Sequence, residues 1–167
     1  GKKLTVSNAI SARMVVLMGA TPVTMRPDEV YQAVSRGVAD GALMPFNGME
    51  TFKIHEVAKM HLDVALGGDT SIVFMNKQAY DKLPAQAKAA IDKNSGLALS
   101  QRAGKATQAE WERARNNVKD TVSTLSTDQE KQWKAALDPA TKEWAQSVPD
   151  GAKVLDAFRS EIAAMRK

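Results

Sequence analysis

The stretch that decides the fold is Met25–Pro45, MRPDEVYQAVSRGVADGALMP. Pro27 suits the first position of a helix, the two acids after it suit the first turn, and Gly37 is typical of the residue that ends a helix. Val38–Met44 then predicts a strand. The stretch is half of a βαβ unit with no catalytic group at its mouth, which suits a lobe that closes over a small molecule better than one that reacts with it.

The same alternation extends to both sides of this stretch. Helices are predicted from Ser7 or Asn8 to Met18, where Gly19 stops the first, and from Asn47 to about Met60. Strands that alternate with helices of this length indicate parallel pairing and right-handed crossovers, hence an α/β fold. The further predicted strands are Leu4–Val6, Pro22–Met25, His61–Leu66 and Ser71–Asn76, with a turn at Gly67-Gly68-Asp69 between the last two.

From Lys77 onward the pattern is almost entirely helical. We expect one long helix over Pro84–Asp120, polar nearly all round in its later part, and a helix of that kind tends to bridge between domains. A short strand at Val122–Leu125 and a capping box of Thr127 with Glu130 follow. Helices at 128–136, 139–147 and 151–165 complete the chain, with Asp138-Pro139 between the first two. The predicted parts are an α/β ligand-binding lobe at 1–76, a bridging helical segment at 77–121 and a C-terminal helical layer at 122–167.

Composition and charge exclude several classes of protein. Of the 167 residues 44% are hydrophobic and 25% charged, enough for one substantial core. The net charge of +4 is spread, because bases alternate with acids and no run of like charges reaches five, so nucleic-acid binding is not expected. The absence of cysteine excludes disulfides and thiolate metal sites. No apolar run approaches the roughly 20 residues that span a bilayer.

The sequence offers no catalytic or metal-binding set. His55-Glu56 and His61 resemble a zinc-protease motif, but that motif needs the two histidines four apart on one helical face, and here they are six apart. Neither glycine-rich phosphate motif is present, and no serine has the surroundings of a nucleophile elbow. We therefore expect no enzyme activity, no metal and no cofactor.

One group of residues points to binding instead. Ligands in open α/β sheets bind beyond the carboxyl ends of the strands. Met44, Phe46 and Asn47 follow the strand that ends at Pro45 and are the expected walls of such a site. The tryptophans Trp111, Trp133 and Trp144 lie in amphipathic helices and are expected to pack the helical layer.

Several blocks of sequence, taken together in order, resemble the solute-binding proteins of TRAP transporters, the tripartite ATP-independent periplasmic carriers of organic acids. The resemblance covers about residues 1–165. The blocks are Gly1–Val6, Met18–Val23, Glu29–Val34, Gly37–Gly41, Phe52–Val57 and Asn76–Pro84.

The resemblance implies a periplasmic receptor of the type II periplasmic-binding-protein fold. Such a receptor traps a small organic acid between two lobes and delivers it to membrane subunits of the transporter. In that family a long helix spans both lobes, which fits the expected helix at Pro84–Asp120. The resemblance also implies that this chain is the C-terminal half only. The lost lobe would then leave an apolar surface uncovered, and we expect the chain alone to self-associate.

The chain departs from the family pattern at the expected site. Thr5 stands where the family usually has an arginine that binds the ligand carboxylate through two hydrogen bonds, and Leu43-Met44 replace a polar pair. Either Arg13 or Arg26 could take the place of this missing ligand-binding arginine. The apolar wall favours a larger, aromatic or neutral substrate. The expected substrate-binding residues are Thr5, Asn8, Met44, Phe46 and Asn47.

A different class of function stays open. In this alternative the chain is a helical protein–protein interaction or regulatory module. It has no small-molecule ligand, and its long polar helix docks a partner.

Overall fold

The chain forms two compact units in the computed structural model, which describes residues 1–67 and 71–165. One unit contains residues 1–63 and 120–167, and the other contains residues 64–119. The chain leaves the first unit after strand β4 (Met60–Asp63) and returns to it just before strand β5 (Thr121–Thr124). The predicted division at residues 76 and 121 stays a prediction.

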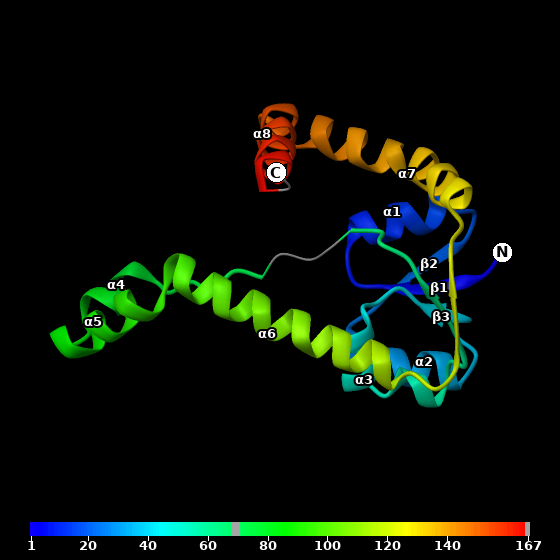
Figure 1. The fold of residues 1–167 in the computed structure, drawn as a ribbon, viewed down its shortest axis with the longest axis horizontal. Helices are drawn as coiled ribbons and strands as arrows, with labels where there is room; N and C mark the ends of the chain where they lie inside the picture. The colour runs from blue at the N-terminus through cyan, green and yellow to red at the C-terminus, as the bar shows by residue number, and fades with distance from the viewer. Residues whose placement is uncertain (68–70, 166–167) are drawn as a thin grey trace. The chain divides into compact units, whose positions relative to one another are not determined.

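A three-stranded parallel sheet lies at the centre of the first unit, in the order β2-β1-β3 (Figure 1). Its strands are β1 (Lys3–Val6), β2 (Thr21–Thr24) and β3 (Gly41–Ala42). The parallel α/β arrangement expected from the sequence is confirmed. β3 is shorter than the predicted Val38–Met44, although backbone hydrogen bonds from Asp40 to Lys3 (2.8 Å) and from Leu43 to Thr5 (3.0 Å) continue the pairing at both ends.

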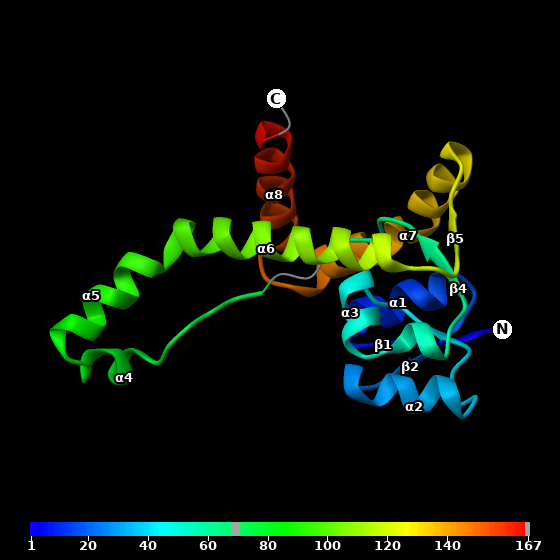
Figure 2. The same ribbon diagram turned by 60° about the horizontal axis from the view of Figure 1, so that its bottom comes forward.

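Helices cover both faces of this sheet. Helix α1 (Ala9–Leu17) and helix α2 (Val30–Ser35), the latter preceded by the 3₁₀ turn η1 (Pro27–Glu29), lie on opposite sides of it (Figures 1 and 2). Gly19 and Gly37 follow the two helices with φ of 78° and 71°, the left-handed conformation that makes glycine a helix stop. The buried apolar side chains of this unit are Val6, Val15, Val30, Ala33, Ala39, Met49, Ile54 and Ala140.

The rest of the first unit is a strand pair and four helical pieces. Helix α3 (Phe46–Thr51) and the 3₁₀ turn η2 (Ile54–Glu56) follow β3. β4 and β5 form a separate parallel pair, with His61 opposite Val122. Helix α7 (Thr127–Ser147) packs along α1, and helix α8 (Gly151–Met165) packs on α7.

The second unit contains helix α4 (Lys77–Asp81), helix α5 (Ala85–Asn94) and helix α6 (Gly96–Asn117). The single helix predicted over Pro84–Asp120 is therefore wrong. Ser95 is extended, with φ of −103° and ψ of −169°, and Gly96 has φ of +62°, so the hydrogen-bonding of α5 ends there. Gly96 permits this break because it lacks the Cβ that makes positive φ costly.

Three further helix predictions need correction. The helix expected over Asn47–Met60 stops at Thr51, and the left-handed Lys53 (φ 56°) separates it from η2. Asp138-Pro139 does not divide two helices, because Pro139 lies inside α7, where the packing of that helix against α1 outweighs one lost backbone hydrogen bond. The capping box lies one residue earlier than expected and joins Ser126 to Gln129.

The strand predictions in the middle of the chain are also partly wrong. The strand expected at His61–Leu66 is β4, one residue earlier and shorter. No strand forms at Ser71–Asn76, since no neighbouring strand pairs with it in the described part of the chain. The turn expected at Gly67-Gly68-Asp69 falls on residues 68–70, outside the described residues. Within the described ranges no helix is both long and apolar enough to cross a membrane.

Two adjacent valines on α1 test this core. Val15 is fully buried and Val16 is 47% exposed. We expect Val15→Ala to lower the free energy of unfolding by about 2 kcal/mol, because it removes two buried methyl groups and leaves a cavity. Val16→Ala should cost less than about 0.5 kcal/mol. Urea denaturation followed by circular dichroism measures both, and equal losses would contradict this packing of α1.

Candidate functional site

The carboxyl ends of β1, β2 and β3 meet at one edge of the parallel sheet, where ligands of open α/β sheets bind. The exit turns there are tied to the central strand. The amide of Met25 donates to the carbonyl of Val6 (3.1 Å), and the amide of Leu43 donates to that of Thr5 (3.0 Å). We call the residues that follow the three strands the carboxyl edge; they are Ser7, Asn8, Met25, Arg26, Leu43, Met44, Phe46 and Asn47.

Two expected site residues come from β1 and the turn after it. Thr5 lies within the strand, paired with Val23 on one side and Ala42 on the other, and it is only 2% exposed. Its side chain therefore belongs to the interior of the unit. Asn8 is exposed and caps α1, where its Oδ1 accepts a hydrogen bond of 2.8 Å from the amide of Ser11. The cap occupies its carbonyl oxygen and leaves the side-chain amide as the group that can contact a ligand.

The other three come from the turn after β3, which holds Met44, and from the start of α3, which holds Phe46 and Asn47. Met44, Phe46 and Asn47 are all half-buried, and the bond between Leu43 and Thr5 sets the start of their turn beside β1. The carbonyl of Asn47 accepts a hydrogen bond of 2.8 Å from the Thr51 hydroxyl. The turn and the first residue of α3 thus contribute two large apolar side chains, Met44 and Phe46, to the carboxyl edge. Their part in ligand binding stays a prediction.

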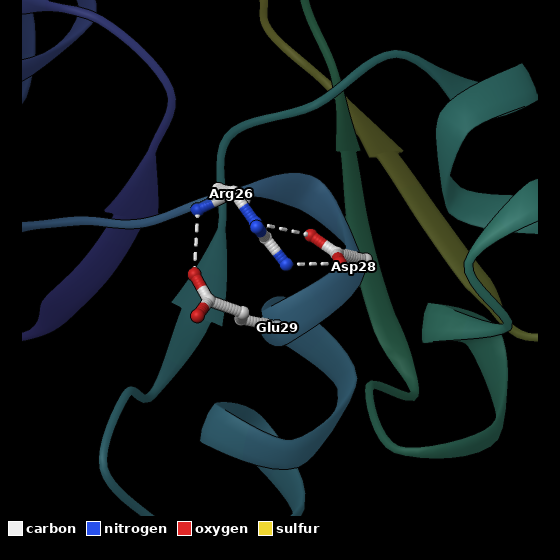
Figure 3. Close-up of polar contacts among 3 residues, drawn as sticks. All are labelled: Arg26, Asp28 and Glu29. Atoms are coloured by element: carbon white, nitrogen blue, oxygen red, sulfur yellow. Dashed lines mark hydrogen bonds and ion pairs between the residues drawn. The ribbon is translucent and has the colours of Figure 1, made fainter.

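Arg26 is the cation of the carboxyl edge, and it lies two residues beyond β2 (Figure 3). Its Nε and Nη2 donate to the two carboxylate oxygens of Asp28, at 3.1 and 2.7 Å, and its backbone amide donates to Glu29 at 2.9 Å. The two guanidinium hydrogen bonds from Arg26 hold the pKa of Asp28 below its ordinary value. The pair uses two of the five N–H donors of the guanidinium, whose side chain is 74% exposed.

Arg13 is engaged elsewhere. Its Nε and Nη2 donate to the two carboxylate oxygens of Glu143, at 2.8 and 2.7 Å, and so join α1 to α7. The hydrogen bonds from Arg13 lower the pKa of Glu143. Sequence reasoning missed this pair because 130 positions separate the partners. Arg13 and Arg26 were the two candidates for binding the ligand carboxylate in place of Thr5. Arg26 lies at the carboxyl edge, whereas Arg13 holds two helices together.

A third carboxylate, also missed, lies at the opposite edge of the sheet. Asp40 accepts hydrogen bonds from the amide of Lys3 (2.8 Å) and the ammonium of Lys2 (3.3 Å), and the backbone bond is the main cause of its lowered pKa. The Asp-Gly pair at the start of β3 is the local signal that could have suggested a structural role. Asp40 closes the amino ends of β1 and β3 and takes no part in the carboxyl edge.

The two histidines belong to different elements. His55 belongs to η2 and His61 to β4. The Nε2 of His61 is buried without a hydrogen-bond partner among the described residues and lies 3.6 Å from Asp120 Oδ2. The described residues contain no cluster of three or more His, Asp or Glu side chains that could hold a metal ion.

Comparison with known proteins gives a consistent result. Residues 1–147 match the family described as bacterial extracellular solute-binding protein, family 7. The C4-dicarboxylate-binding periplasmic protein DctP of Rhodobacter capsulatus is 33% identical over 162 residues, which cover 94% of this chain and 47% of that protein. The chain thus spans about half the length of the curated relative it matches.

Solved structures agree in fold over 98% or more of the chain. A TRAP solute-binding protein from a marine metagenome, specific for aromatic acids and solved with metahydroxyphenylacetate, has a TM-score of 0.88 at 30% identity. The match covers 100% of this chain and 56% of that protein. A TRAP solute-binding protein of Rhodoferax ferrireducens, solved with copurified benzoate, has a TM-score of 0.86 at 27% identity, with 98% and 55% coverage.

The Arg13–Glu143 pair predicts a contribution to stability that depends on pH. A carboxylate whose pKa is lowered on folding stabilises the protein above its unfolded pKa, near 4.3, and loses this effect as the pH falls through the folded pKa. We expect the melting temperature to fall more steeply between pH 5 and 3 in the unsubstituted chain than in Glu143→Gln. Glu130→Gln on the same helix is the control. Parallel curves for the unsubstituted chain and Glu143→Gln would contradict the pairing.

Proposed function

The chain belongs to family 7 of the bacterial extracellular solute-binding proteins, and we propose that it forms one lobe of the periplasmic receptor of a TRAP transporter. The observation that carries this proposal is the carboxyl edge, where a cation follows β2 and two large apolar side chains follow β3, the two strands that flank β1. The relatives that match 94% and 100% of the chain are a C4-dicarboxylate-binding periplasmic protein and a TRAP solute-binding protein. The protein binds its solute without chemical change and presents it to membrane subunits.

The proposed ligand is a small organic acid with an aromatic or otherwise apolar body. Arg26 supplies the positive charge for its carboxylate, while Met44 and Phe46 line the apolar side. Two relatives at 30% and 27% identity hold metahydroxyphenylacetate and benzoate. The curated relative is named for C4-dicarboxylates, whose second carboxylate would need a second cation. Thr5 is uncharged as well as buried and supplies none, which favours a monocarboxylate with a ring.

Ligand screening on the full-length protein tests this proposal. We expect benzoate and 3-hydroxybenzoate to raise the melting temperature more than succinate does, since a ligand at 100 times its Kd adds about 2.7 kcal/mol of stability. Arg26→Gln should remove most of the shift, and Arg13→Gln should keep it. The reverse result would assign the ligand carboxylate to Arg13. The proposal fails if no organic acid raises the melting temperature.

An exposed apolar stripe on α8 is evidence that a second lobe exists. Val154, Phe158 and Met165 are 52%, 62% and 78% exposed and are spaced by four and seven residues, which places them on one face of the helix. In the complete receptor we propose that the other lobe covers this stripe. The same stripe is what the alternative function, a helical interaction module, would present to a partner protein. Sequence upstream of Gly1 in the gene separates the two, because only the receptor requires a further α/β lobe.

The exposed stripe predicts that residues 1–167 alone self-associate. Phe158→Lys should shift the chain toward monomer, because it places a charge at the centre of the apolar face. Ser160→Lys adds the same charge to the same helix outside the stripe and should leave the association unchanged. Light scattering coupled to size-exclusion chromatography measures both. A clean monomer of the unsubstituted chain across micromolar concentrations would contradict the proposal.

A further inference from the structure

Asn47-Gly48, at the start of α3, is the one asparagine–glycine pair in the sequence. The side-chain amide of an asparagine can be attacked by the backbone nitrogen of the next residue. Glycine hinders that attack least, because it has no Cβ. This lability is one reason why asparagine is counted among the thermolabile residues.

The side chain of Asn47 is available for this reaction. It is half-buried, and its amide group makes no hydrogen bond within residues 1–67 and 71–165. Other asparagines of the chain are held in place. The Oδ1 atoms of Asn8 and Asn76 each accept a hydrogen bond from a helix amide, and the Nδ2 of Asn94 donates to a backbone carbonyl.

The backbone at the start of α3 is weakly held. The helix has only six residues, and its N-cap position is Pro45, whose side chain makes no capping hydrogen bond. Gly48 is the third residue of the helix, where an amide has no acceptor within the helix, and glycine favours a helix less than other residues apart from proline. The first turn therefore opens easily, and the nitrogen of Gly48 can then approach the Cγ of Asn47.

The two aspartate–glycine pairs of the chain are protected from the same attack. The carboxylate of Asp40 accepts a hydrogen bond of 2.8 Å from the amide of Lys3, and an ionised carboxylate resists a nucleophile. In Asp150-Gly151 the attacking nitrogen is occupied, since the amide of Gly151 donates to the carbonyl of Val148 at 3.1 Å. The structure thus singles out Asn47.

We propose that Asn47 deamidates spontaneously and that the carboxylate it gains weakens the binding of anionic ligands at the carboxyl edge. The amide nitrogen of Gly48 loses its proton to water and bonds to Cγ of Asn47, and ammonia leaves. Water then opens the resulting succinimide ring at either carbonyl and gives aspartate or isoaspartate. The reaction consumes one water and releases one ammonia, with no oxidation or reduction.

The place of Asn47 gives the reaction its consequence. Asn47 follows β3 and Arg26 follows β2, the two strands that flank β1, so both belong to the carboxyl edge. A new carboxylate there repels the carboxylate of a ligand and competes with it for the guanidinium of Arg26. This second part of the inference rests on the proposed binding of an organic acid.

Ageing of the full-length protein at mildly alkaline pH tests the reaction, because the nitrogen of Gly48 attacks as it loses its proton. Peptide mass spectrometry should detect aspartate and isoaspartate at Asn47 before deamidation at any other asparagine. Gly48→Ala should slow the conversion at least about fivefold, since alanine stabilises the helical turn and its methyl group hinders the attack. The variant should fold, because the added Cβ would lie 3.6 Å from Cδ and Cγ of Pro45, an ordinary contact. Asn47 that stays unchanged would overturn the inference.

Ligand binding gives the second readout. The rise in melting temperature with benzoate should shrink as the unsubstituted protein ages and persist in Gly48→Ala. Asn47→Asp should reproduce the aged state and raise the Kd for benzoate by about fivefold or more. Gln132→Glu adds the same charge on the exposed side of α7 and should leave the Kd nearly unchanged.

The outcomes separate this inference from the ligand proposal. Equal effects of Asn47→Asp and Gln132→Glu, or conversion of Asn47 without loss of binding, would overturn the inference. An unchanged Asn47 in a protein that binds benzoate refutes only this inference. Deamidation at Asn47 in a protein that binds no organic acid refutes the ligand proposal and the second part of the inference, while the modification site stands.

Discussion

The pairing of β1 with a strand on each side is the constraint on which the first unit depends. Four residues, Lys3–Val6, are bonded to β2 along their whole length and to β3 at their centre. Their carbonyls also fix the turns that follow both neighbours, through the amides of Met25 and Leu43. The carboxyl edge is therefore positioned by backbone hydrogen bonds, and its side chains are free to differ between relatives with different ligands.

Arginine–carboxylate pairs have two different roles in this unit. The Arg13–Glu143 pair joins segments far apart in the chain, and its loss would loosen α7 from α1. The Arg26–Asp28 pair is local and largely exposed, at 74% and 56% of the two side chains. Exposed ion pairs contribute little to stability, because water competes for both partners. In the binding mode that we propose, replacing Asp28 on the guanidinium by a ligand carboxylate would therefore cost little stability.

The sequence predicted those features of the structure that depend on a few neighbouring residues. The cap at Asn8, the stops at Gly19 and Gly37 and the alternation of elements each follow from a few neighbouring residues. Because the exit turns follow strand ends, the places of Met44, Phe46 and Asn47 at the carboxyl edge could also be predicted. Tertiary contacts decided the rest. Packing carries α7 through Pro139, burial places Thr5 in the interior, and Glu143 reaches Arg13 only after folding.

The strand pair β4–β5 has a consequence for how this protein can vary. The chain leaves after β4 at Asp63 and returns before β5 at Asp120, so the 56 residues of the second unit (64–119) form one loop closed by adjacent strands. The entropy of closing a flexible loop grows only with the logarithm of its length, and a doubling adds roughly 0.6 kcal/mol. Insertions, deletions or a wholly different excursion can therefore be accepted between β4 and β5 while the parallel sheet is kept. The second unit and the sheet can thus evolve at different rates within one gene.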